Sequence, residues 1–347
     1  MPDRSRDDAA LARALVSWFR DHARELPWRH ADRDPYHALV SEFMLQQTQV
    51  GRVVERFGAF VGRFPDAPAL ARADESEVLG MWSGLGYYRR ARLLHACAKA
   101  IVDEHGGAVP RDPAALRALP GIGAYTSGAI ASIVFGAREP AVDGNVIRVL
   151  LRLERDDADP GAPATARRAR ARAAELLGAC DDPGALSEGL MELGATVCTP
   201  RNPSCGACPW RDRCGARAHG ETDQIPRPKA RAARSDLYCA ALIVRDGRGR
   251  VLAEQRPGSG LWARMWQPPA IESARRAPTT DELASALGAR GVGRLGAFTH
   301  ITTHRRVHFE VHAGALDEPG ADRRFATLDE LGSWGLSSAH RRAFEMA

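Results

Sequence analysis

Four cysteines beyond the middle of the chain form the densest set of reactive side chains. Cys198, Cys205, Cys208 and Cys214 have the spacing C-x6-C-x2-C-x5-C. Thiolates are soft ligands, and in a reducing compartment such a cluster indicates metal binding rather than disulfide formation. Both structural zinc and a [4Fe–4S] cluster take four thiolates, so the spacing alone leaves these two groups open.

Two carboxylates lie among apolar residues and are further candidates for chemistry. Glu42 lies in VSEFMLQQTQV, beside the apolar face of a predicted helix, and Asp143 lies in AVDGNV, before an apolar run. A mid-helix glutamate is usually solvated, and an aspartate before glycine usually caps a helix or turn. Taken singly, both residues therefore also fit ordinary structural positions.

A glycine-rich turn and a polar run suggest contacts with a phosphate backbone and with bases. Gly121 and Gly123 lie in LPGIG between two predicted helices, where a tight turn and the next helix N-terminus can bind a phosphate. This pattern is typical of a helix–hairpin–helix, which grips DNA without reading its sequence. An ordinary helix–helix turn explains the same five residues. The run QQTQ, which starts at Gln46, suits hydrogen bonding to a partner but also fits a polar helix face.

Length and composition limit the class of protein that positions these residues. With 347 residues, 44% of them hydrophobic and 26% charged, the chain is long enough for about two globular domains and is not wholly disordered. The net charge of +5 is compatible with a polyanionic partner but does not prove one. No apolar run approaches the roughly 20 residues of a membrane span, and the N-terminus resembles no secretion signal. We therefore expect a cytoplasmic protein without a membrane partner.

The hydrophobic patterns predict a multidomain protein. We expect an all-α catalytic region over residues 1–214, a polar linker over 215–236 and a smaller α+β domain over 237–347. Within the first region the hairpin falls at about 113–135 and the cysteine loop at 198–214.

Individual elements follow from local signals. Residues 87–101 have a helical pattern, and Asp112-Pro113 predicts the start of a short helix that Pro120-Gly121 ends. Gly247-Arg248-Gly249 predicts a hairpin between two β-compatible runs.

Taken in series, the motifs resemble one family. The resemblance covers about residues 9–270 strongly and is carried by LPWR, SEFMLQQTQV, SGLGYYRRARLLH, LPGIGAYTSGAI, AVDGNVIRVL and MELGATVCTPRNPSCGACPWRDRC. The chain resembles MutY-type adenine DNA glycosylases of the helix–hairpin–helix superfamily. The four-cysteine spacing is that superfamily's iron–sulfur loop, so the resemblance implies a [4Fe–4S] cluster rather than zinc.

The resemblance also implies a reaction. Such enzymes flip adenine mispaired with 8-oxoguanine or guanine out of the duplex and hydrolyse its N-glycosidic bond. By position, Glu42 matches the general acid and Asp143 the ionised carboxylate that stabilises the sugar. Tyr125 and Asn145 match residues that orient these carboxylates. We expect a monomer that binds double-stranded DNA containing A:8-oxoguanine or A:G and is associated with the nucleoid.

Further positions match binding residues of the family. The residues around the adenine pocket are Arg24, Leu26, Trp28, Arg29, Leu45, Val50 and Glu188. The residues expected to contact DNA are Gln46, Gln47, Thr48, Tyr87, Gly121, Gly123, Thr303 and His304. Arg89, Arg90 and Arg92 are either phosphate contacts or a solvated face.

Two departures from related families refine the prediction. Tyr125 stands where endonuclease III-like relatives carry a nucleophilic lysine. This disfavours a bifunctional glycosylase-lyase, because a phenol forms no Schiff base.

The C-terminal region resembles a Nudix fold without its acidic Mg²⁺-binding helix, which disfavours a nucleotide hydrolase. Thr302-Thr303-His304 is the nearest match to the F-S-H-like loop with which the family recognises the lesion, and it lacks the aromatic residue. A non-enzymatic DNA-damage-binding protein is disfavoured because both Glu42 and Asp143 are present.

Overall fold

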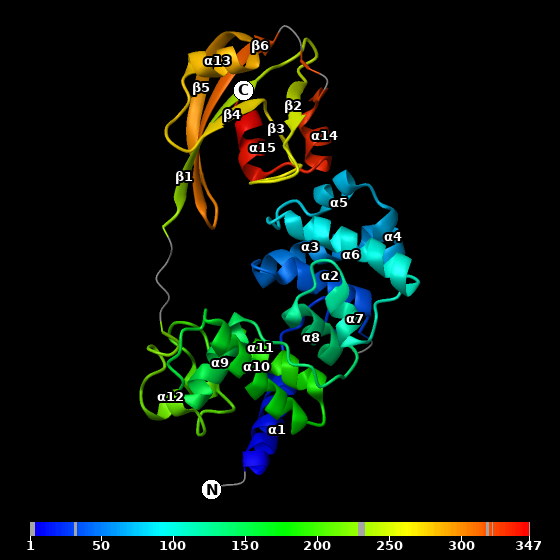
Figure 1. The fold of residues 1–347 in the computed structure, drawn as a ribbon, viewed down its shortest axis with the longest axis vertical. Helices are drawn as coiled ribbons and strands as arrows, with labels where there is room; N and C mark the ends of the chain where they lie inside the picture. The colour runs from blue at the N-terminus through cyan, green and yellow to red at the C-terminus, as the bar shows by residue number, and fades with distance from the viewer. Residues whose placement is uncertain (1–3, 31–32, 228–232, 317–318, 321, 347) are drawn as a thin grey trace. The chain divides into compact units, whose positions relative to one another are not determined.

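The computed structural model describes residues 4–30, 33–227, 233–316, 319–320 and 322–346 (Figure 1). The chain divides into two compact units. The first comprises Met1–Gln46, Asp66–Ala71 and Ala96–Ala230, and the second comprises Gln47–Pro65, Arg72–His95 and Arg231–Ala347.

Up to residue 227 the regular structure of the described residues is helical, as the sequence predicts. The elements are α1 (Arg4–His22), α2 (Pro35–Leu45), α3 (Val50–Arg63), α4 (Ala67–Arg72), α5 (Glu75–Met81), α6 (Arg89–His105), α7 (Pro113–Ala118), α8 (Ala124–Ile133), α9 (Gly144–Glu154), α10 (Pro163–Gly178), α11 (Pro183–Thr196), the 3-10 turn η1 (Cys205–Ala207) and α12 (Gly215–Ala218). Helices α3 and α5 belong to the second unit, and α6 runs from the second unit into the first.

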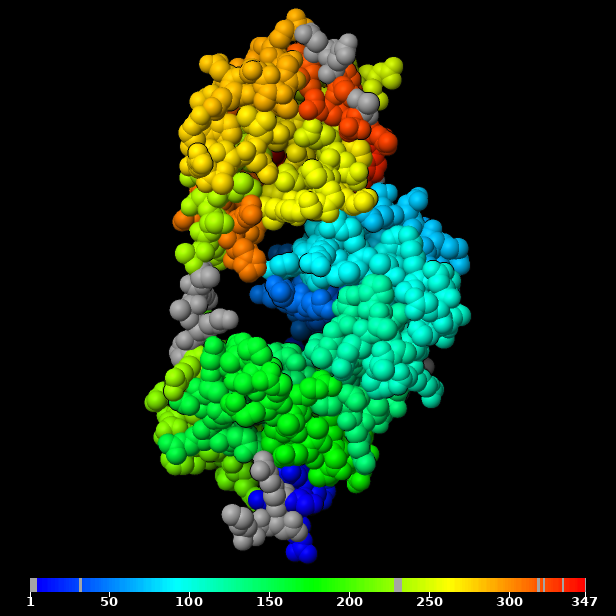
Figure 2. All heavy atoms as spheres, in the orientation of Figure 1, coloured from blue at the N-terminus to red at the C-terminus, as the bar shows by residue number. Residues whose placement is uncertain are grey.

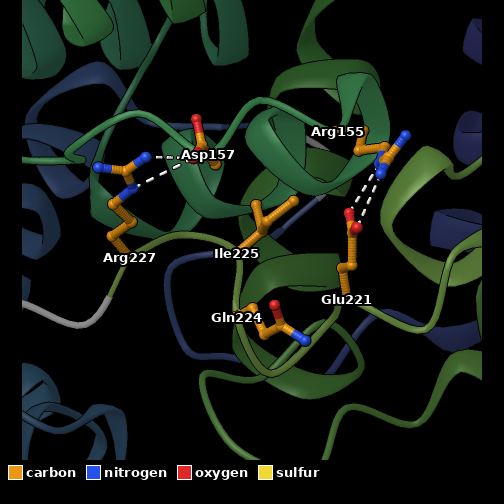
Figure 3. A pocket seen from close by; sticks show the side chains of 6 residues that line it. All are labelled: Arg155, Asp157, Glu221, Gln224, Ile225 and Arg227. Atoms are coloured by element: carbon orange, nitrogen blue, oxygen red, sulfur yellow. Dashed lines mark hydrogen bonds and ion pairs between the residues drawn. The ribbon is translucent and has the colours of Figure 1, made fainter.

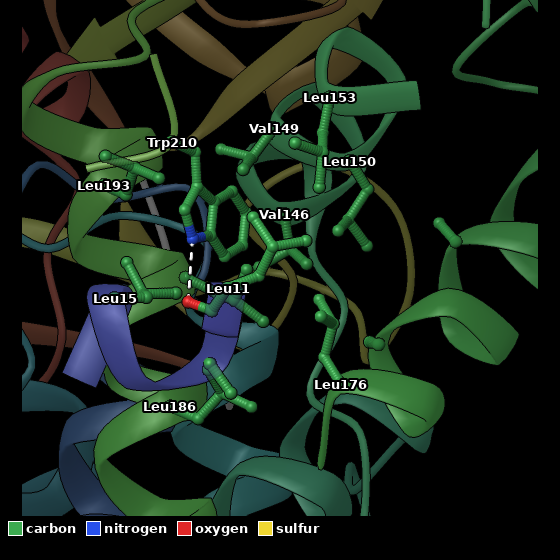
Figure 4. Close-up of a cluster of buried hydrophobic side chains, with 14 of the residues drawn as sticks. Leu11, Leu15, Val146, Val149, Leu150, Leu153, Leu176, Leu186, Leu193 and Trp210 are labelled. Carbon is green, nitrogen blue, oxygen red and sulfur yellow. Dashed lines mark hydrogen bonds between the residues drawn. The ribbon is translucent and has the colours of Figure 1, made fainter. Parts of the chain in front are cut away.

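The hydrophobic core of the first unit joins its N-terminal helix to its C-terminal part. Side chains of α1, α9, α10 and α11 pack together with Trp210, which follows the cysteine turn (Figure 4). The indole Nε1–H of Trp210 donates a hydrogen bond to the carbonyl oxygen of Leu11 over 2.9 Å. Because Trp210 is only 2% exposed, the cysteine loop is anchored to the core and not suspended in solvent.

Local signals place the ends of one predicted helix correctly and miss those of another, since α6 spans Arg89–His105 rather than residues 87–101. Asp112 caps α7, since its carboxylate accepts a hydrogen bond from the Ala115 amide over 2.8 Å, and the predicted short helix is confirmed. Helix α6 begins at Arg89 rather than at residue 87. Tyr87 has a φ of +48°, in the left-handed region, and therefore cannot belong to the helix.

The start of the predicted linker differs from the expectation. Residues 215–218 form α12, and the side chains of Ala216 and Ile225 are buried in the first unit's core. The Arg152 guanidinium also donates a hydrogen bond to the Ile225 carbonyl oxygen over 2.8 Å. Two isolated apolar side chains in a polar segment gave too weak a pattern to predict this packing. The linker residues 228–232 lie outside the described residues.

The C-terminal part of the second unit contains two sheets. The strands are β1 (Ser235–Ile243), β2 (Val251–Gln255), β3 (Trp266–Gln267), β4 (Ala270–Ser273), β5 (Ala289–Ile301), β6 (Arg305–Leu316) and β7 (Arg323–Ala326). The sheet orders are β4-β1-β6-β5 and β3-β2-β7. The helices α13 (Thr280–Leu287), α14 (Leu328–Ser333) and α15 (Ser338–Phe344) complete an α+β domain.

The predicted hairpin at residues 247–249 is only partly correct. A tight turn is present, because Gly249 has a φ of +77° and the Asp246 amide donates to the Arg250 carbonyl oxygen. However, β1 and β2 belong to different sheets. β1 pairs with β4 and β6 along its two edges, so β2 turns away and pairs with β3 and β7.

Candidate active site in the helical unit

Glu42 is a buried carboxyl group in the middle of α2. Asp34 caps this helix, accepting hydrogen bonds from the Tyr36 and His37 amides, and Pro35 occupies its first turn. Most side chains around Glu42 on α2 are apolar and buried, among them Leu39 and Phe43, so the helix carries the carboxyl group away from water. Its Oε2 atom is buried and has no hydrogen-bond partner in the structure.

The surroundings of Glu42 keep it able to hold a proton. Burial is the largest influence and raises the pKa of Glu42, against a hydrogen bond from Tyr125 that lowers it. The charges of Asp143 and Glu188 raise the pKa further, whereas the charge of Arg29 lowers it. Together these influences give Glu42 a pKa of about 7. A carboxyl group with this pKa can donate a proton at neutral pH.

Tyr125 lies in the first turn of α8 and faces Glu42. Its hydroxyl is hydrogen-bonded to the Glu42 carboxyl group and lies 3.4 Å from the Met191 sulfur. Burial and the neighbouring carboxylates raise the pKa of the phenol well above its ordinary value, so Tyr125 stays a hydrogen-bond donor.

Asp143 caps the N-terminus of α9 and is held as an acceptor. Its Oδ1 accepts the Val146 amide over 2.8 Å, and its Oδ2 accepts the Asn145 side-chain amide over 3.0 Å. Both carboxylate oxygens therefore have donors, which fix the orientation of the Asp143 side chain at the N-terminus of α9. The geometry thus brings together a buried acid, a phenol and a hydrogen-bonded carboxylate.

A chain of hydrogen bonds joins Asp143 to the cysteine loop. The Arg148 guanidinium donates to the Asn145 Oδ1 atom over 2.8 Å, and also to the carbonyl oxygens of Gly194 and Cys198, both over 2.8 Å. Arg148 is buried, and its neighbours in the sequence gave no indication of this contact. Asn145 therefore has fixed partners on both sides, which determines how its amide faces Asp143.

Three predicted pocket residues form part of an ion-pair network. Arg29 lies between Glu188 and Glu192, at 3.0 Å from each, and Arg24 binds both oxygens of Glu192. Arg33 binds both oxygens of Glu188. The sequence prediction missed Arg33 and Glu192, although Glu188 and Glu192 are four residues apart on one helix and therefore share a face.

The other predicted pocket residues are less constrained. Leu26 and Trp28 are half-buried in the segment before α2, and Leu45 is half-buried at the end of α2. Val50 is the first residue of α3 and belongs to the second unit, whereas the other predicted pocket residues belong to the first.

The glycine-rich turn has the backbone geometry expected of a hairpin. Gly121 has a φ of +78°, which a residue with a side chain adopts only with strain, and Gly123 precedes α8. On α8 itself, a Cβ atom at Gly128 would meet the Pro140 carbonyl oxygen at 2.4 Å. The missing side chain at Gly128 therefore allows α8 to pack closely against the backbone of Pro140.

The residues predicted to contact DNA are in different situations. Gln47 is exposed with a φ of +56°, whereas Thr48 accepts a hydrogen bond from Arg90 over 2.9 Å. Gln46 is half-buried directly after α2. Tyr87 is 41% exposed in the left-handed conformation. Such exposure with strained backbone is compatible with contacts to a large ligand.

The turn between β5 and β6 carries the predicted lesion-recognising residues. Thr302 uses its hydroxyl to close the turn with Arg305, while Thr303 and His304 are exposed. The end of this hairpin extends from its sheet (Figure 1), and its atoms lie at the surface (Figure 2). Thr303 and Tyr87, both in the second unit, are hydrogen-bonded through their hydroxyls.

The cysteine loop offers donors suited to thiolate sulfur. The Arg152 guanidinium lies 3.3 Å from the Cys198 sulfur, and the backbone amides of Arg217 and Ala216 are hydrogen-bonded to Cys214. Burial, followed by the charges of the other three cysteines, raises the pKa of Cys208 to about 11. Four cysteine thiolates are the usual ligand set of an iron–sulfur cluster, and the loop supplies four cysteines. Among the described residues, no three His, Cys, Asp or Glu side chains are arranged to hold a single metal ion.

A polar surface pocket lies beside this loop but contains none of the predicted catalytic residues. It has a volume of about 380 Å³ and is lined by Arg155, Asp157, Glu221, Gln224, Ile225 and Arg227 (Figure 3). Arg155 is paired with Glu221 and Arg227 with Asp157, so its charges neutralise one another. We therefore place the candidate active site at Glu42 and Asp143.

Helix α13 of the C-terminal α+β domain offers few ligands for Mg²⁺. Helix α13 carries Asp281 and Glu282, and Glu282 is bound to Arg276 and to the amide of Thr279.

In the described part of the chain, no helix is both long and apolar enough to span a membrane.

Three family models match separate parts of the chain. Residues 40–175 match the HhH-GPD superfamily of base excision DNA repair proteins, and residues 198–214 match the iron–sulfur binding domain of endonuclease III. Residues 240–346 match the NUDIX domain. These matches confirm the predicted fold class.

Similar proteins cover from 57% to 98% of this chain. The adenine DNA glycosylase of Mus musculus is 34% identical, covering 98% of this chain and 78% of its own. That of Mycolicibacterium smegmatis is 50% identical over 203 residues, covering 57% of this chain and 68% of its own. A solved thermostable thymine-DNA glycosylase is 26% identical with a TM-score of 0.55, and covers 62% of this chain and 100% of its own.

Proposed function

Because this chain belongs to the family of adenine DNA glycosylases, we propose that it removes adenine mispaired with 8-oxoguanine or guanine. The adenine must leave the base stack to reach a buried acid such as Glu42, so the reaction includes base flipping. Water then replaces the adenine on the sugar, and the enzyme is a hydrolase.

The observation that carries this proposal is the unpaired, buried Oε2 atom of Glu42 beside a hydrogen-bonded Asp143. Protonated Glu42 donates its proton to the leaving adenine, which weakens the N-glycosidic bond. Asp143 remains ionised and stabilises the positive charge that develops on the sugar. Asn145 and Tyr125 orient the two carboxyl groups through the hydrogen bonds already described.

The position of Tyr125 supports a monofunctional enzyme. An amine at this place would form a Schiff base with the sugar and cleave the strand by β-elimination, but a phenol does not. We therefore propose that the product is an intact strand with an abasic site.

The four cysteines would hold a [4Fe–4S] cluster, the group that their spacing takes in this superfamily. The cluster would join the four partly buried cysteines through one centre and so stabilise the fold of the loop. The hydrogen bonds from Arg148 to Cys198 and Asn145 give the loop a contact with the active site. We propose further that the enzyme acts as a monomer on duplex DNA in the cytoplasm and reads the opposite base with Thr303 and His304.

The opposite-base preference can be tested directly. Single-turnover excision should be measured on duplexes with adenine opposite 8-oxoguanine, guanine, cytosine or thymine. We expect fast excision in the first two duplexes and slow excision in the last two. Equal rates on all four duplexes would contradict the proposed specificity. Glu42→Gln serves as the inactive control, since its amide cannot supply a proton.

A further inference from the structure

Glu192 is a buried carboxylate that none of the proposed catalytic steps uses. It lies on α11, four residues after Glu188, and is 1% exposed. Its Oε2 atom accepts hydrogen bonds from Arg24 over 2.9 Å and from Arg29 over 3.0 Å. Burying a charge is costly unless it is paired, so the contacts with both arginines are needed to stabilise this buried carboxylate.

Each of the three guanidinium nitrogens of Arg29 donates a hydrogen bond. Its Nε donates to Glu188 over 3.0 Å, its Nη1 donates to the Arg24 carbonyl oxygen over 3.3 Å, and its Nη2 donates to Glu192. The group also lies 5.4 Å from the centre of the Phe19 ring. These contacts fix where the positive charge of Arg29 lies.

Four side chains influence the pKa of Glu42, and Arg29 is the one among them with a positive charge. Glu42 faces Tyr125 from α8, Asp143 from the start of α9, Glu188 from α11 and Arg29 from the segment before α2. A direct bond from Arg29 to the free Oε2 of Glu42 would favour the ionised carboxylate, typically by about 1–3 pKa units. The proton that the reaction needs would then be lost at neutral pH.

We propose that Glu192 is a positioning residue, which together with Glu188 keeps the Arg29 guanidinium from bonding to Glu42. The Oε2 atom of Glu42 thereby stays free to carry the proton for adenine. Burial raises the pKa of Glu192, but hydrogen bonds and charges from Arg24 and Arg29 outweigh it, so the carboxylate stays ionised and holds both arginines. This inference rests on the proposed function, because it requires Glu42 to be the acid.

The test is the pH dependence of single-turnover adenine excision by Glu192→Gln. The amide still fills the space but no longer balances the charge of Arg29, so this positive charge acts more strongly on Glu42. If the pKa of Glu42 falls by about one unit, excision at pH 8.5 should drop about tenfold while excision at pH 5.5 stays within about twofold. Because this ratio is measured within one preparation, a fraction of protein that never folded lowers both rates equally.

Two further variants keep the test decisive. Glu192→Asp retains the charge on a shorter side chain and should restore most of the wild-type ratio. Glu154→Gln is the matched control, since Glu154 is paired with Arg172 over 2.6 Å in the same unit and is not among the groups that act on Glu42. We expect its ratio to equal that of the wild type.

The outcomes separate this inference from the proposed function. A wild-type pH ratio in Glu192→Gln, or the same change in Glu154→Gln, would overturn the positioning role while Glu42→Gln remains inactive. Full excision by Glu42→Gln would overturn both the positioning role of Glu192 and the acid role of Glu42.

Discussion

Replacing Glu42 by glutamine should make the protein more stable at high pH. Burial raises the pKa of Glu42 from its ordinary 4.5 to about 7 in the folded protein. Between these two values the folded state binds more protons than the unfolded state, so the free energy of unfolding falls as pH rises. At about 1.36 kcal/mol for each pKa unit, the ionised folded protein is about 3 kcal/mol less stable above pH 7.

A glutamine side chain does not gain or lose a proton in this pH range, and its shape is similar to that of glutamate. We therefore expect Glu42→Gln to unfold at a similar temperature to the wild type at pH 4.5–5, but at a temperature several degrees higher at pH 8. Thermal unfolding of both proteins, with the same cluster content, at both pH values measures this difference. The low-pH pair is an internal control for any change in packing. A pH-independent difference between the two proteins, or a variant less stable at pH 8, would refute the burial argument.

The remaining predictions concern catalysis and packing. Asp143→Asn should bind DNA normally but excise adenine about 10²-fold more slowly or worse in single turnover, because the amide cannot stabilise a cationic sugar; a near-normal rate would remove Asp143 from the mechanism. Borohydride should trap no covalent complex between wild-type protein and DNA, because Tyr125 offers no amine; efficient trapping would favour the bifunctional class. Gly128→Val should lower the unfolding temperature clearly, since a Cβ atom would lie 2.4 Å from the Pro140 carbonyl oxygen, and an unchanged temperature would show that this contact can relax.

Much of the site could be predicted from local sequence, because its parts are local motifs. The caps at Asp112 and Asp143 and the left-handed Gly121 depend only on residues within a few positions. The resemblance then assigned Glu42 its expected role, which periodicity could not, since a buried and a solvated glutamate look alike in one sequence.

The missed features all depend on residues distant in the chain. Glu192 contacts Arg24 across 168 positions, and Arg148 contacts Cys198 across 50. No local pattern identifies such partners, because charge pairing is decided by how the helices pack. The buried Ile225 was missed for the same reason, since its neighbours in sequence are polar while its neighbours in space are apolar.

The most direct test of the central claim is single-turnover excision of adenine opposite 8-oxoguanine by the wild type and Glu42→Gln at pH 7. Both proteins should bind the duplex with similar affinity, and only the step that needs a proton should differ. The account predicts that the variant is slower by about 10²-fold or more, the contribution typical of a general acid. An excision rate within about threefold of the wild type would contradict the assignment of Glu42 as the acid.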